Sequence, residues 1–252
     1  QDKGAYGRVV HLQPMKWIND WPVIGADDDN DGKGEPVLWY KKPDVGKTFP
    51  LSSPVESDEF NTTKLGLQWQ WQANPKQTWA FLTGNALRLY AQQMPDSARN
   101  LWDIPNVLMQ KFPAEEFTVT VKCNCKLHWG EEKFNFIVMG SDYASFSIAS
   151  KDFGTPYLFF EYCLGADKGN TGTVANATRL THTELYLRIR VNNGAICSFS
   201  YGYDDREYKE LYASFTAKPG KWIGSKFGFC CTRVGKTNDA GFVDIDWVRI
   251  EN

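Results

Sequence analysis

Apolar residues alternate with polar ones along much of this chain, and this period of two is the feature that most constrains its fold. In "FTVTVKC" (117–123), every second residue from Phe117 to Cys123 is apolar. The stretches "LYLRIRV" (185–191) and "FVDIDWVRI" (242–250) alternate in the same way. Because successive side chains of a strand point to opposite faces, these segments are typical of half-buried antiparallel strands.

Further strand candidates follow one another from about residue 56 onward, and no convincing helical periodicity interrupts them. Gly, Asn, Asp and Pro residues, which favour turns, separate these candidates. With 252 residues, 42% of them apolar, the chain is long enough to bury a large core. We therefore expect an all-β, two-sheet sandwich of the jelly-roll kind. The other candidates are "QWQWQ", "ALRLY", "FNFIVMG", "ASFSIA", "YLFFEYC", "AICSFSYGY" and "KFGFCC".

Two tryptophans share one face of the "QWQWQ" segment, and two interpretations of them stay open. Trp69 and Trp71 alternate with glutamines, as large residues do on the inner face of a sandwich strand. They could instead form an outer platform that stacks on sugar rings. The core interpretation is favoured, because exposed sugar platforms come more naturally from loops.

Charge and cysteine content exclude several classes of function. The net charge of -2 and the pI of about 6.0 argue against nucleic acid as a partner. No stretch approaches the roughly 20 apolar residues of a membrane span, and the N-terminus has no signal-peptide pattern. The six cysteines form no C-x-x-C pair, so buried free thiols are expected. Cys125 and His128 could form half of a zinc site, but no second pair completes it.

Known catalytic motifs do not appear in the chain. It contains no G-x-S-x-G, no Gly-rich phosphate loop and no H-E-x-x-H. Jelly-roll glycosidases usually carry E-x-D-x-x-E on one strand, whereas Asp244-x-Asp246 lacks both glutamates. The adjacent acidic pairs at 115–116, 131–132 and 204–205 have diverging side chains, and we interpret them as surface charge.

An acidic run at residues 27–31 has some features of a calcium loop. With Asp27 at position 1, Gly32 takes the glycine position, but position 12 is Leu38 and not the bidentate glutamate. The flanking prolines Pro22 and Pro36 also disfavour the two helices of an EF-hand. A solvated acidic turn is the favoured interpretation.

The chain divides into three parts by composition. Residues 36–56, with four prolines and few turn-forming pairs, predict an extended, semi-rigid connector whose apolar residues lie along a surface. Residues 57–252 form the sandwich. Residues 1–35 hold at most two or three strands, too few for a core, so they need a partner that this chain does not contain. Without it, Tyr6, Val9, Trp17, Trp21 and Ile24 would be uncovered.

These parts resemble the C-terminal portion of glycoside hydrolase family 43. The stretch "QDKGAYGRVVHLQPMKWINDWPVIGADDDNDGKGEPV" (1–37) is similar to the end of the family's five-bladed β-propeller, where the chain leaves its last blade. The stretches "DEFNTTKLGLQWQWQANP" (58–75) and "DIDWVRI" (244–250) resemble the start and end of its C-terminal concanavalin A-like β-sandwich. The resemblance covers nearly the whole chain, is specific in residues 1–37 and is weak between the two sandwich motifs.

The resemblance implies that residues 1–35 are the last strands of an upstream propeller. It also implies a parent enzyme, a β-xylosidase or α-L-arabinofuranosidase, that cleaves xylose- or arabinose-containing plant glycans with inversion. Its general acid, general base and third carboxylate come from earlier blades, so no catalytic residue can be assigned here. The chain starts without Met and is expected to be processed or a fragment. We expect an exported protein, periplasmic or extracellular, although the chain itself carries no signal for it.

Two functions of different classes follow from this resemblance. In the first, the sandwich packs on the propeller and shapes its substrate pocket. In the second, it is an independent carbohydrate-binding module. The Pro-rich connector with apolar anchors favours fixed docking, because a flexible Gly/Ser linker would be expected for an independent module. No substrate-binding residue can be named from the sequence.

One structural calcium ion is expected from the same resemblance. Sandwiches of this kind often bind calcium where the first and last strands meet. The matching carboxylate on the last strand is Asp246, with Asp244 as the alternative, and Asp58 or Glu59 lies at the other end of the seam. Such oxygen ligands suit calcium. The alternative is that Asp246 only accepts hydrogen bonds from backbone amides.

Overall fold

The computed structural model describes residues 2–128, 131–151, 155–235 and 241–252. The chain forms two compact units, a larger one of Asp2–Arg8 and Pro54–Asn252 and a smaller one that contains Val9–Ser53. The regular elements of the described residues are strands and short 3-10 helices, so the prediction of an all-β protein is confirmed. None of the described helices is long and apolar enough to span a membrane.

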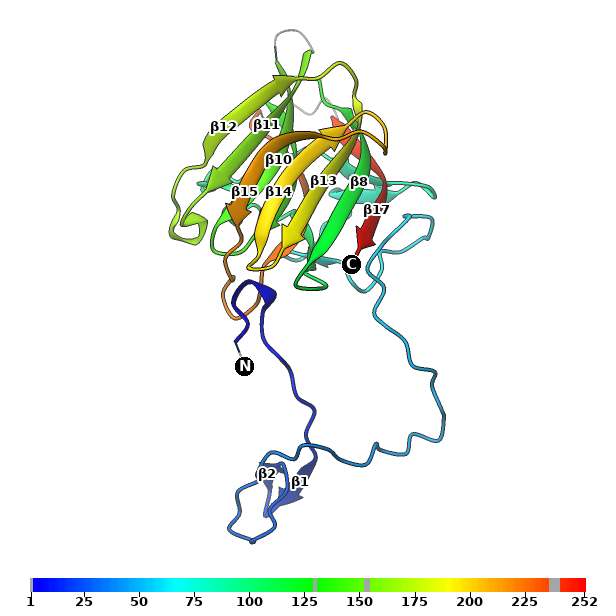
Figure 1. Cartoon of the computed structure of the whole chain (residues 1–252), viewed down its shortest axis with the longest axis vertical. Coiled ribbons are helices and arrows are strands. Elements are labelled where there is room, and N and C mark those ends of the chain that lie inside the picture. The colour runs from blue at the N-terminus through cyan, green and yellow to red at the C-terminus, as the bar shows by residue number, and fades with distance from the viewer. Residues whose placement is uncertain (1, 129–130, 152–154, 236–240) are drawn as a thin grey trace. The chain divides into compact units, whose positions relative to one another are not determined.

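The larger unit is a sandwich of two sheets, and the labelled strands of the first lie side by side in Figure 1. Neighbouring strands in this sheet are antiparallel. In spatial order, this seven-stranded sheet contains β15 (Lys209–Thr216), β14 (Ile196–Gly202), β13 (Glu184–Asn192), β8 (Phe117–Lys126), β17 (Phe242–Glu251), β5 (Leu87–Tyr90) and β4 (Ala80–Leu82).

The second sheet has eight strands and is antiparallel apart from one short parallel pairing. In spatial order, it contains β12 (Thr173–Arg179), β11 (Thr155–Cys163), β10 (Tyr143–Lys151), β9 (Glu132–Met139), β16 (Lys226–Arg233), β7 (Leu108–Lys111) and β3 (Gln70–Trp71), while β6 (Gln92–Gln93) pairs with β16. Two 3-10 helices, η2 (Leu101–Asp103) and η3 (Ala166–Lys168), lie in its connections, and η1 (Gly4–Tyr6) is near the N-terminus.

The core lies between the two sheets, and the alternating residues of the sequence provide it. Val119 and Val121 of β8 are fully buried, as are Leu187 and Ile189 of β13 on the neighbouring strand. Aromatic rings from the two sheets meet across the core, for example Phe160 and Phe199, whose centroids are 4.9 Å apart. Burying a side chain of this size contributes about 1.5–3 kcal/mol relative to leaving it exposed.

Trp69 is part of this core, as the favoured interpretation of the "QWQWQ" segment predicts. Its side chain is 8% exposed and packs against Phe60, Phe227 and Phe229. Trp71 is only half-buried and packs at 5.4 Å against Trp79. The six cysteines are buried and unpaired, which confirms the prediction of free thiols.

The smaller unit contains a hairpin of β1 (Met15–Ile18) and β2 (Trp21–Ile24). Asn19 and Asp20, the two residues of its turn, have φ of 50° and 63°. Positive φ at both positions is the mark of the tight hairpin turns that asparagine and aspartate tolerate. The hairpin has no core of its own, because Trp17 is 68% and Trp21 73% exposed.

The acidic run after β2 folds as an exposed turn. Asp27 accepts hydrogen bonds from the backbone N–H groups of Asp31 and Gly32 at 3.1 and 3.2 Å. Asp31 in turn pairs with the Lys33 ammonium at 2.8 Å, and this contact lowers the pKa of the Asp31 carboxyl. Oxygens of Asp27, Asp29 and Asp31 lie within 4.8 Å of one another, but their hydrogen bonds are those of a solvated turn.

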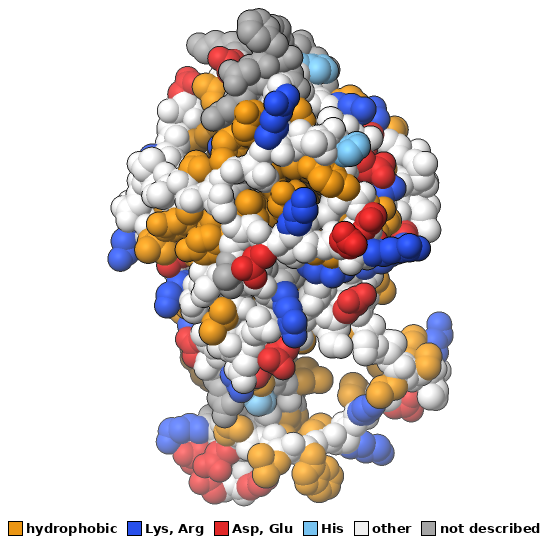
Figure 2. Space-filling model, turned by 45° about the horizontal axis from the view of Figure 1, so that its top comes forward, with side chains coloured by type: hydrophobic (Ala, Val, Ile, Leu, Met, Phe, Trp, Pro, Cys, Tyr) orange, Lys and Arg blue, Asp and Glu red, His pale blue; other side chains and the backbone are white. Residues whose placement is uncertain are grey.

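The connector that follows has no strand in residues 36–53 and exposes its apolar side chains. Hydrophobic side chains, orange in Figure 2, lie at the surface of the smaller unit beside acidic ones. The exposed fractions are 86% for Trp39, 62% for Tyr40, 71% for Phe49 and 99% for Leu51.

Candidate docking and pocket-shaping site

A loop between β15 and β16, residues 217–225, presents a tryptophan to solvent. Trp222 has φ of 65° and an 80% exposed side chain. Left-handed backbone costs a bulky residue about 1–3 kcal/mol, and such strain persists where the surroundings impose it. An exposed, strained aromatic residue is a candidate for contact with a ligand or partner.

Hydrogen bonds to neighbouring segments fix the base of this loop. The Ser225 side chain is buried, and its hydroxyl donates to the Lys218 carbonyl at 2.7 Å, which closes the loop on itself. The Pro219 carbonyl accepts a hydrogen bond from the Ser141 N–H at 2.9 Å. Because Gly140 packs against the Lys218 carbonyl, with no room for a Cβ, the loop base is tightly confined.

The N-terminal segment 2–8 packs against this loop. The Ser225 N–H donates to the Ala5 carbonyl at 2.6 Å, and Gly224 packs so closely on Gly7 that a Cβ on Gly224 would lie 2.5 Å from the Gly7 nitrogen. The Arg8 guanidinium lies 5.1 Å from the centre of the Trp222 ring. The backbone approach therefore places Arg8 beside Trp222, in range of a cation–π contact.

Tyr6 was predicted to be uncovered in this chain, and this prediction was wrong. Its hydroxyl accepts a hydrogen bond from the Ala195 N–H at 2.7 Å, and its half-buried ring packs against the sandwich core. Tyr6 is thus covered by the larger unit. The other residues predicted to be uncovered are exposed, with fractions of 41% for Val9, 68% for Trp17, 73% for Trp21 and 61% for Ile24.

A pocket of about 240 Å³ lies beside the loop, on the outer face of the eight-stranded sheet. Its apolar lining includes Trp102, Met109 and Ile223, and Lys221 and Lys226 also line it. An apolar lining with a few polar groups is typical of binding sites, and this pocket is smaller than the usual range of about 300–1,000 Å³. Its two lysines suit a partner group that carries a negative charge.

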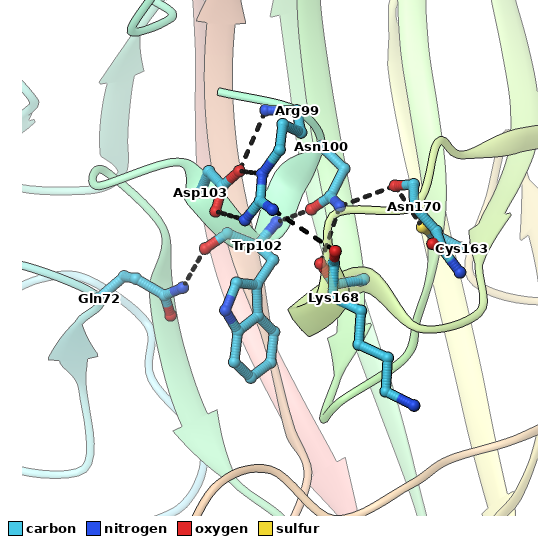
Figure 3. A network of polar contacts seen from close by, with 9 residues as sticks. Gln72, Arg99, Asn100, Trp102, Asp103, Cys163, Lys168 and Asn170 are labelled. Carbon is cyan, nitrogen blue, oxygen red and sulfur yellow. Dashed lines mark hydrogen bonds and ion pairs between the residues drawn. The ribbon is translucent and has the colours of Figure 1, made fainter. Parts of the chain in front are cut away.

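A polar network positions Trp102 at this pocket (Figure 3). The Trp102 N–H donates to the Asn100 side chain at 2.8 Å, and the Trp102 carbonyl accepts from the Gln72 amide at 2.8 Å. The Asn100 amide also donates to the carbonyls of Ala166 and Asn170 at 2.9 and 2.8 Å, which joins η2 to the segment around η3. The Trp102 backbone is therefore fixed from both sides.

An ion pair closes the same network. Arg99 binds Asp103 through two nitrogen–oxygen contacts of 2.8 and 3.1 Å and also donates to the Lys168 carbonyl at 3.5 Å (Figure 3). The bond from Arg99 lowers the pKa of the Asp103 carboxyl. Charge-assisted bidentate contacts of this kind hold geometry better than a single hydrogen bond.

Lys226 is the unusual group of the pocket. It lies directly opposite Lys111 in the β16–β7 register, and burial, followed by repulsion from Lys111, lowers its pKa. Within the described part of the chain, neither lysine forms an ion pair. Like charges placed opposite each other on neighbouring strands are destabilising. The pocket therefore has excess positive charge that this part of the chain does not balance.

The residues predicted to bind calcium lie near one seam but serve separate contacts. Asp58 pairs through its backbone with Val248, as expected where the first and last strands meet. Its side chain turns to the indole N–H of Trp69, at 2.8 Å. Glu59 binds Arg249 at 2.9 and 3.2 Å, and Asp246 lies 2.8 Å from the Lys122 ammonium.

Of these three carboxylates, Glu59 and Asp246 line a common pocket and Asp58 does not. The carboxylates of Glu59 and Asp246 each form an ion pair with a basic side chain. Among the described residues, neither belongs to a cluster of potential metal ligands. Asp244, the alternative, binds Arg88 at 2.7 and 2.8 Å. The three predicted ligands thus do not fit calcium as one set, and the ion itself stays a prediction.

The adjacent acidic pairs are surface charges with one exception. Glu132, predicted to be exposed, is buried and accepts hydrogen bonds from the N–H groups of His128 and Gly241 at 2.8 and 3.1 Å. Gly241 also leaves no room for a Cβ beside this carboxylate. The prediction for Glu132 was wrong because the sequence of two adjacent glutamates does not show that one of them accepts hydrogen bonds from two separate loops.

Neither Trp222 nor Lys226 was singled out from the sequence. Trp222 lies in "PGKWIGSK", where glycines flank an aromatic residue in a polar loop, and this pattern is the available signal. No local sequence pattern marks Lys226, because Lys111, the lysine that repels it, is on a strand more than a hundred residues away in sequence.

Comparison with known proteins identifies the sandwich. Residues 57–251 match the family described as the β-xylosidase C-terminal concanavalin A-like domain. The chain is 30% identical to a β-xylosidase of Formosa agariphila, over 96% of this chain and 42% of that protein. A putative β-xylosidase of Xylanibacter ruminicola is also 30% identical, with 92% of this chain and 41% of that protein covered. The chain thus spans less than half the length of these curated relatives.

Solved structures support the same fold. A bifunctional GH43-CE protein of Bacteroides eggerthii superposes with a TM-score of 0.73 at 23% identity, covering 100% of this chain and 32% of that one. The GH43 protein BlXynB of Bacillus licheniformis gives 0.70 at 19% identity, covering 99% and 48%. The chain belongs to the family of β-xylosidase C-terminal concanavalin A-like domains of glycoside hydrolase family 43.

Proposed function

We propose that this sandwich is the accessory portion of a glycoside hydrolase that acts on xylose- or arabinose-containing plant glycans. In this proposal it packs on an upstream catalytic propeller, and loop 217–225 forms one wall of the substrate pocket. The observation that carries the proposal is Trp222, which is 80% exposed on a loop whose base is fixed by buried contacts.

The N-terminal segment supports the location of this contact. Residues 2–8 lie on the sandwich beside the Trp222 loop, where Ala5 and Gly7 contact Ser225 and Gly224. A domain that precedes this segment would therefore join the sandwich close to Trp222. An aromatic ring at such a junction suits stacking on a sugar ring.

The charge of the neighbouring pocket supports a docked partner. Lys221 and Lys226 line it without a described acidic partner, while Trp102 and Ile223 provide apolar surface. A propeller loop with an acidic side chain would compensate the lysines and cover the apolar lining. The exposed apolar connector, with Trp39 and Phe49, would also be covered by such a docked domain.

Catalysis in this proposal belongs to the upstream domain. Inversion requires two carboxyl groups about 6.5–9.5 Å apart, one to protonate the leaving oxygen and one to activate water. The proposal assigns neither group to this chain, so we expect the isolated chain to hydrolyse neither p-nitrophenyl xyloside nor p-nitrophenyl arabinofuranoside. Its own contribution would be to orient the sugar and exclude water through Trp222.

The test is Trp222→Ala in the full-length protein. We expect kcat/KM for short xylo-oligosaccharides to fall by about tenfold or more, since a lost aromatic contact costs about 1.4 kcal/mol or more. The melting temperature of the isolated chain should not fall, because Trp222 makes few contacts within it. Phe81→Ala is the matched control, since Phe81 is an aromatic residue that is 61% exposed on edge strand β4.

Phe81→Ala should leave kcat/KM unchanged. Equal kinetics of Trp222→Ala and the unsubstituted protein would contradict the pocket-shaping role. Hydrolysis of either p-nitrophenyl glycoside by the isolated chain, retained after stringent purification, would contradict the assignment of catalysis to the upstream domain.

A further inference from the structure

A second pocket, of about 540 Å³, lies on the outer face of the seven-stranded sheet, away from the Trp222 loop. Neighbouring strands β5, β17 and β8 provide its floor, through Arg88, Asp244 and Asn124. The walls come from Glu59 and Asn61 in the loop before β3, from the β4–β5 turn at 83–86, and from Trp247. Its volume is in the range of small-molecule sites, about 300–1,000 Å³.

The charges of this pocket are balanced within the sandwich. Each of its three carboxylates has a basic partner: Asp244 binds Arg88, Glu59 binds Arg249 and Asp246 binds Lys122. A cation would have to displace a lysine or arginine, and an anion would meet three carboxylates. The pocket therefore favours a neutral ligand.

The polar groups of the pocket suit hydroxyl groups. Asn61, Asn85 and Asn124 provide amides, and Thr83 provides a hydroxyl, beside the carboxylates and the Arg88 guanidinium. Amides offer both donors and acceptors, and a sugar hydroxyl likewise donates one hydrogen bond and accepts others. A mixed set of this kind matches a polyhydroxylated ligand better than an apolar one.

One atom of the pocket lacks a partner. The side-chain oxygen Oδ1 of Asn124 is buried, and no described group donates a hydrogen bond to it. Asn124 lies opposite Asp244 in the β8–β17 register, in the floor of the pocket. Because Oδ1 has almost no accessible surface, a ligand hydroxyl would reach this acceptor only after the Asn124 amide turned toward the pocket.

Aromatic stacking contributes little here. The Trp247 ring is 9% exposed, with the Arg249 guanidinium 4.1 Å from its centre and Tyr186 packed at 5.9 Å. It can form a wall but not an open platform. Recognition must then come from hydrogen bonds, which limits affinity and makes the position of each amide important.

We propose that this outer-face pocket binds a neutral oligosaccharide, with one or two sugar rings held by hydrogen bonds to Asn124 and its neighbours. The site is separate from the pocket beside Trp222. It would hold the protein on a glycan chain while hydrolysis takes place elsewhere. The proposal does not depend on the docking role, because it requires only the sandwich.

The test is calorimetric titration of the isolated chain with xylotriose and with arabinotriose, in buffer with a chelator. We expect at least one of them to bind with a Kd of about 0.1–1 mM, equivalent to roughly 4–5.5 kcal/mol. Asn124→Ala should weaken binding about tenfold, since it removes an amide from the floor of the pocket. Asn85→Ala, in the β4–β5 turn, should weaken it as well, and Asn74→Ala, in an exposed loop outside the pocket, should not.

Melting temperatures of the three variants would separate loss of binding from loss of folding. Binding that persists unchanged in Asn124→Ala and Asn85→Ala would overturn the proposal, as would no heat from either sugar at about 10 mM, ten or more times the expected Kd. Binding that appears only when calcium is added would identify a metal-dependent site and would also overturn it. Trp222→Ala should leave this binding unchanged, whatever it does to catalysis.

Discussion

The pocket beside the Trp222 loop and the pocket on the outer face of the seven-stranded sheet differ in how their charges are compensated. On the outer face of the seven-stranded sheet, each of three carboxylates meets its own lysine or arginine. Beside the Trp222 loop, Lys226 faces Lys111 and neither has an ion-pair partner among the described residues. A surface that compensates its own charges needs no charged partner, whereas unbalanced charge and exposed aromatic residues are typical of an interface with another protein domain.

A substitution at the base of loop 217–225 should have the largest effect on stability. A Cβ on Gly140 would lie 1.5 Å from the Lys218 carbonyl oxygen, so Gly140→Ala must displace backbone. We expect the free energy of unfolding to fall by about 3 kcal/mol or more, measured by urea denaturation. Gly84→Ala, in the turn beside the balanced pocket, is the control: nothing lies within 4 Å of a Cβ there, and φ of +98° alone predicts a loss of about 1–2 kcal/mol.

A loss for Gly140→Ala no greater than that for Gly84→Ala would show that loop 217–225 yields easily. The rigid support inferred for Trp222 would then be wrong.

Removing a compensated charge should destabilise the sandwich. Asp244→Asn leaves the Arg88 guanidinium, which is partly buried over the Phe242 ring, without its bidentate partner. We expect a loss of about 1–2 kcal/mol, between the values for exposed and for buried ion pairs. Arg88→Met with Asp244→Asn completes a double-mutant cycle, and a coupling energy near zero would contradict the view that the pair is a stabilising unit.

Removing an uncompensated charge should instead raise the free energy of unfolding. Lys226→Met deletes an ammonium that is partly buried opposite Lys111, and we expect a gain of about 0.2–1 kcal/mol in the isolated chain at pH 7. Because burial lowers the pKa of Lys226 below its unfolded value, the penalty is present below the folded pKa and vanishes above the unfolded pKa of about 10.4.

The gain from Lys226→Met should therefore shrink as the pH is raised through the lowered folded-state pKa and be lost above the unfolded pKa of about 10.4. Urea denaturation at pH 7 and pH 10.5 measures it. Destabilisation by Lys226→Met at pH 7 would mean that the lysine is already compensated and that the two pockets do not differ as inferred.

Long, regularly alternating strands were predictable from the sequence, whereas short or exposed strands mostly were not. In β8 and β13 the period of two follows burial directly, since both are central strands with one face in the core. β12, "TVANATR", is an edge strand with six of seven residues exposed, so no apolar pattern marks it. β4 and β15, which also lie at sheet edges, were missed, whereas edge strand β3 lies in the predicted "QWQWQ" segment and the short buried strand β7 was not predicted.

The candidate sites were less predictable, because they depend on contacts between distant segments. Asp244 and Asp246 were noticed as acidic residues, but their partners Arg88 and Lys122 lie on strands that only the sheet order brings alongside. Trp222 lies on a loop that the N-terminal segment, more than two hundred residues away in sequence, helps to fix. Such pairings are set by topology and leave no local pattern.

Removing calcium should have the smallest effect on stability. It directly tests the outer-face pocket, in which each carboxylate has a basic partner. The sequence predicts an ion at Asp246, with Glu59 and Asp58, but calcium would have to displace Lys122 from Asp246 and Arg249 from Glu59. Loss of a bound ion lowers stability by RT ln(1 + [L]/Kd), so a weakly held ion contributes little. We therefore expect a chelator to change the melting temperature by no more than about 1 °C, a few tenths of a kcal/mol for a domain of this size. Asp246→Ala should be equally insensitive to the chelator. A fall of several degrees that Asp246→Ala abolishes, with calcium found by elemental analysis, would instead establish the ion and show that the basic partners move aside when it binds.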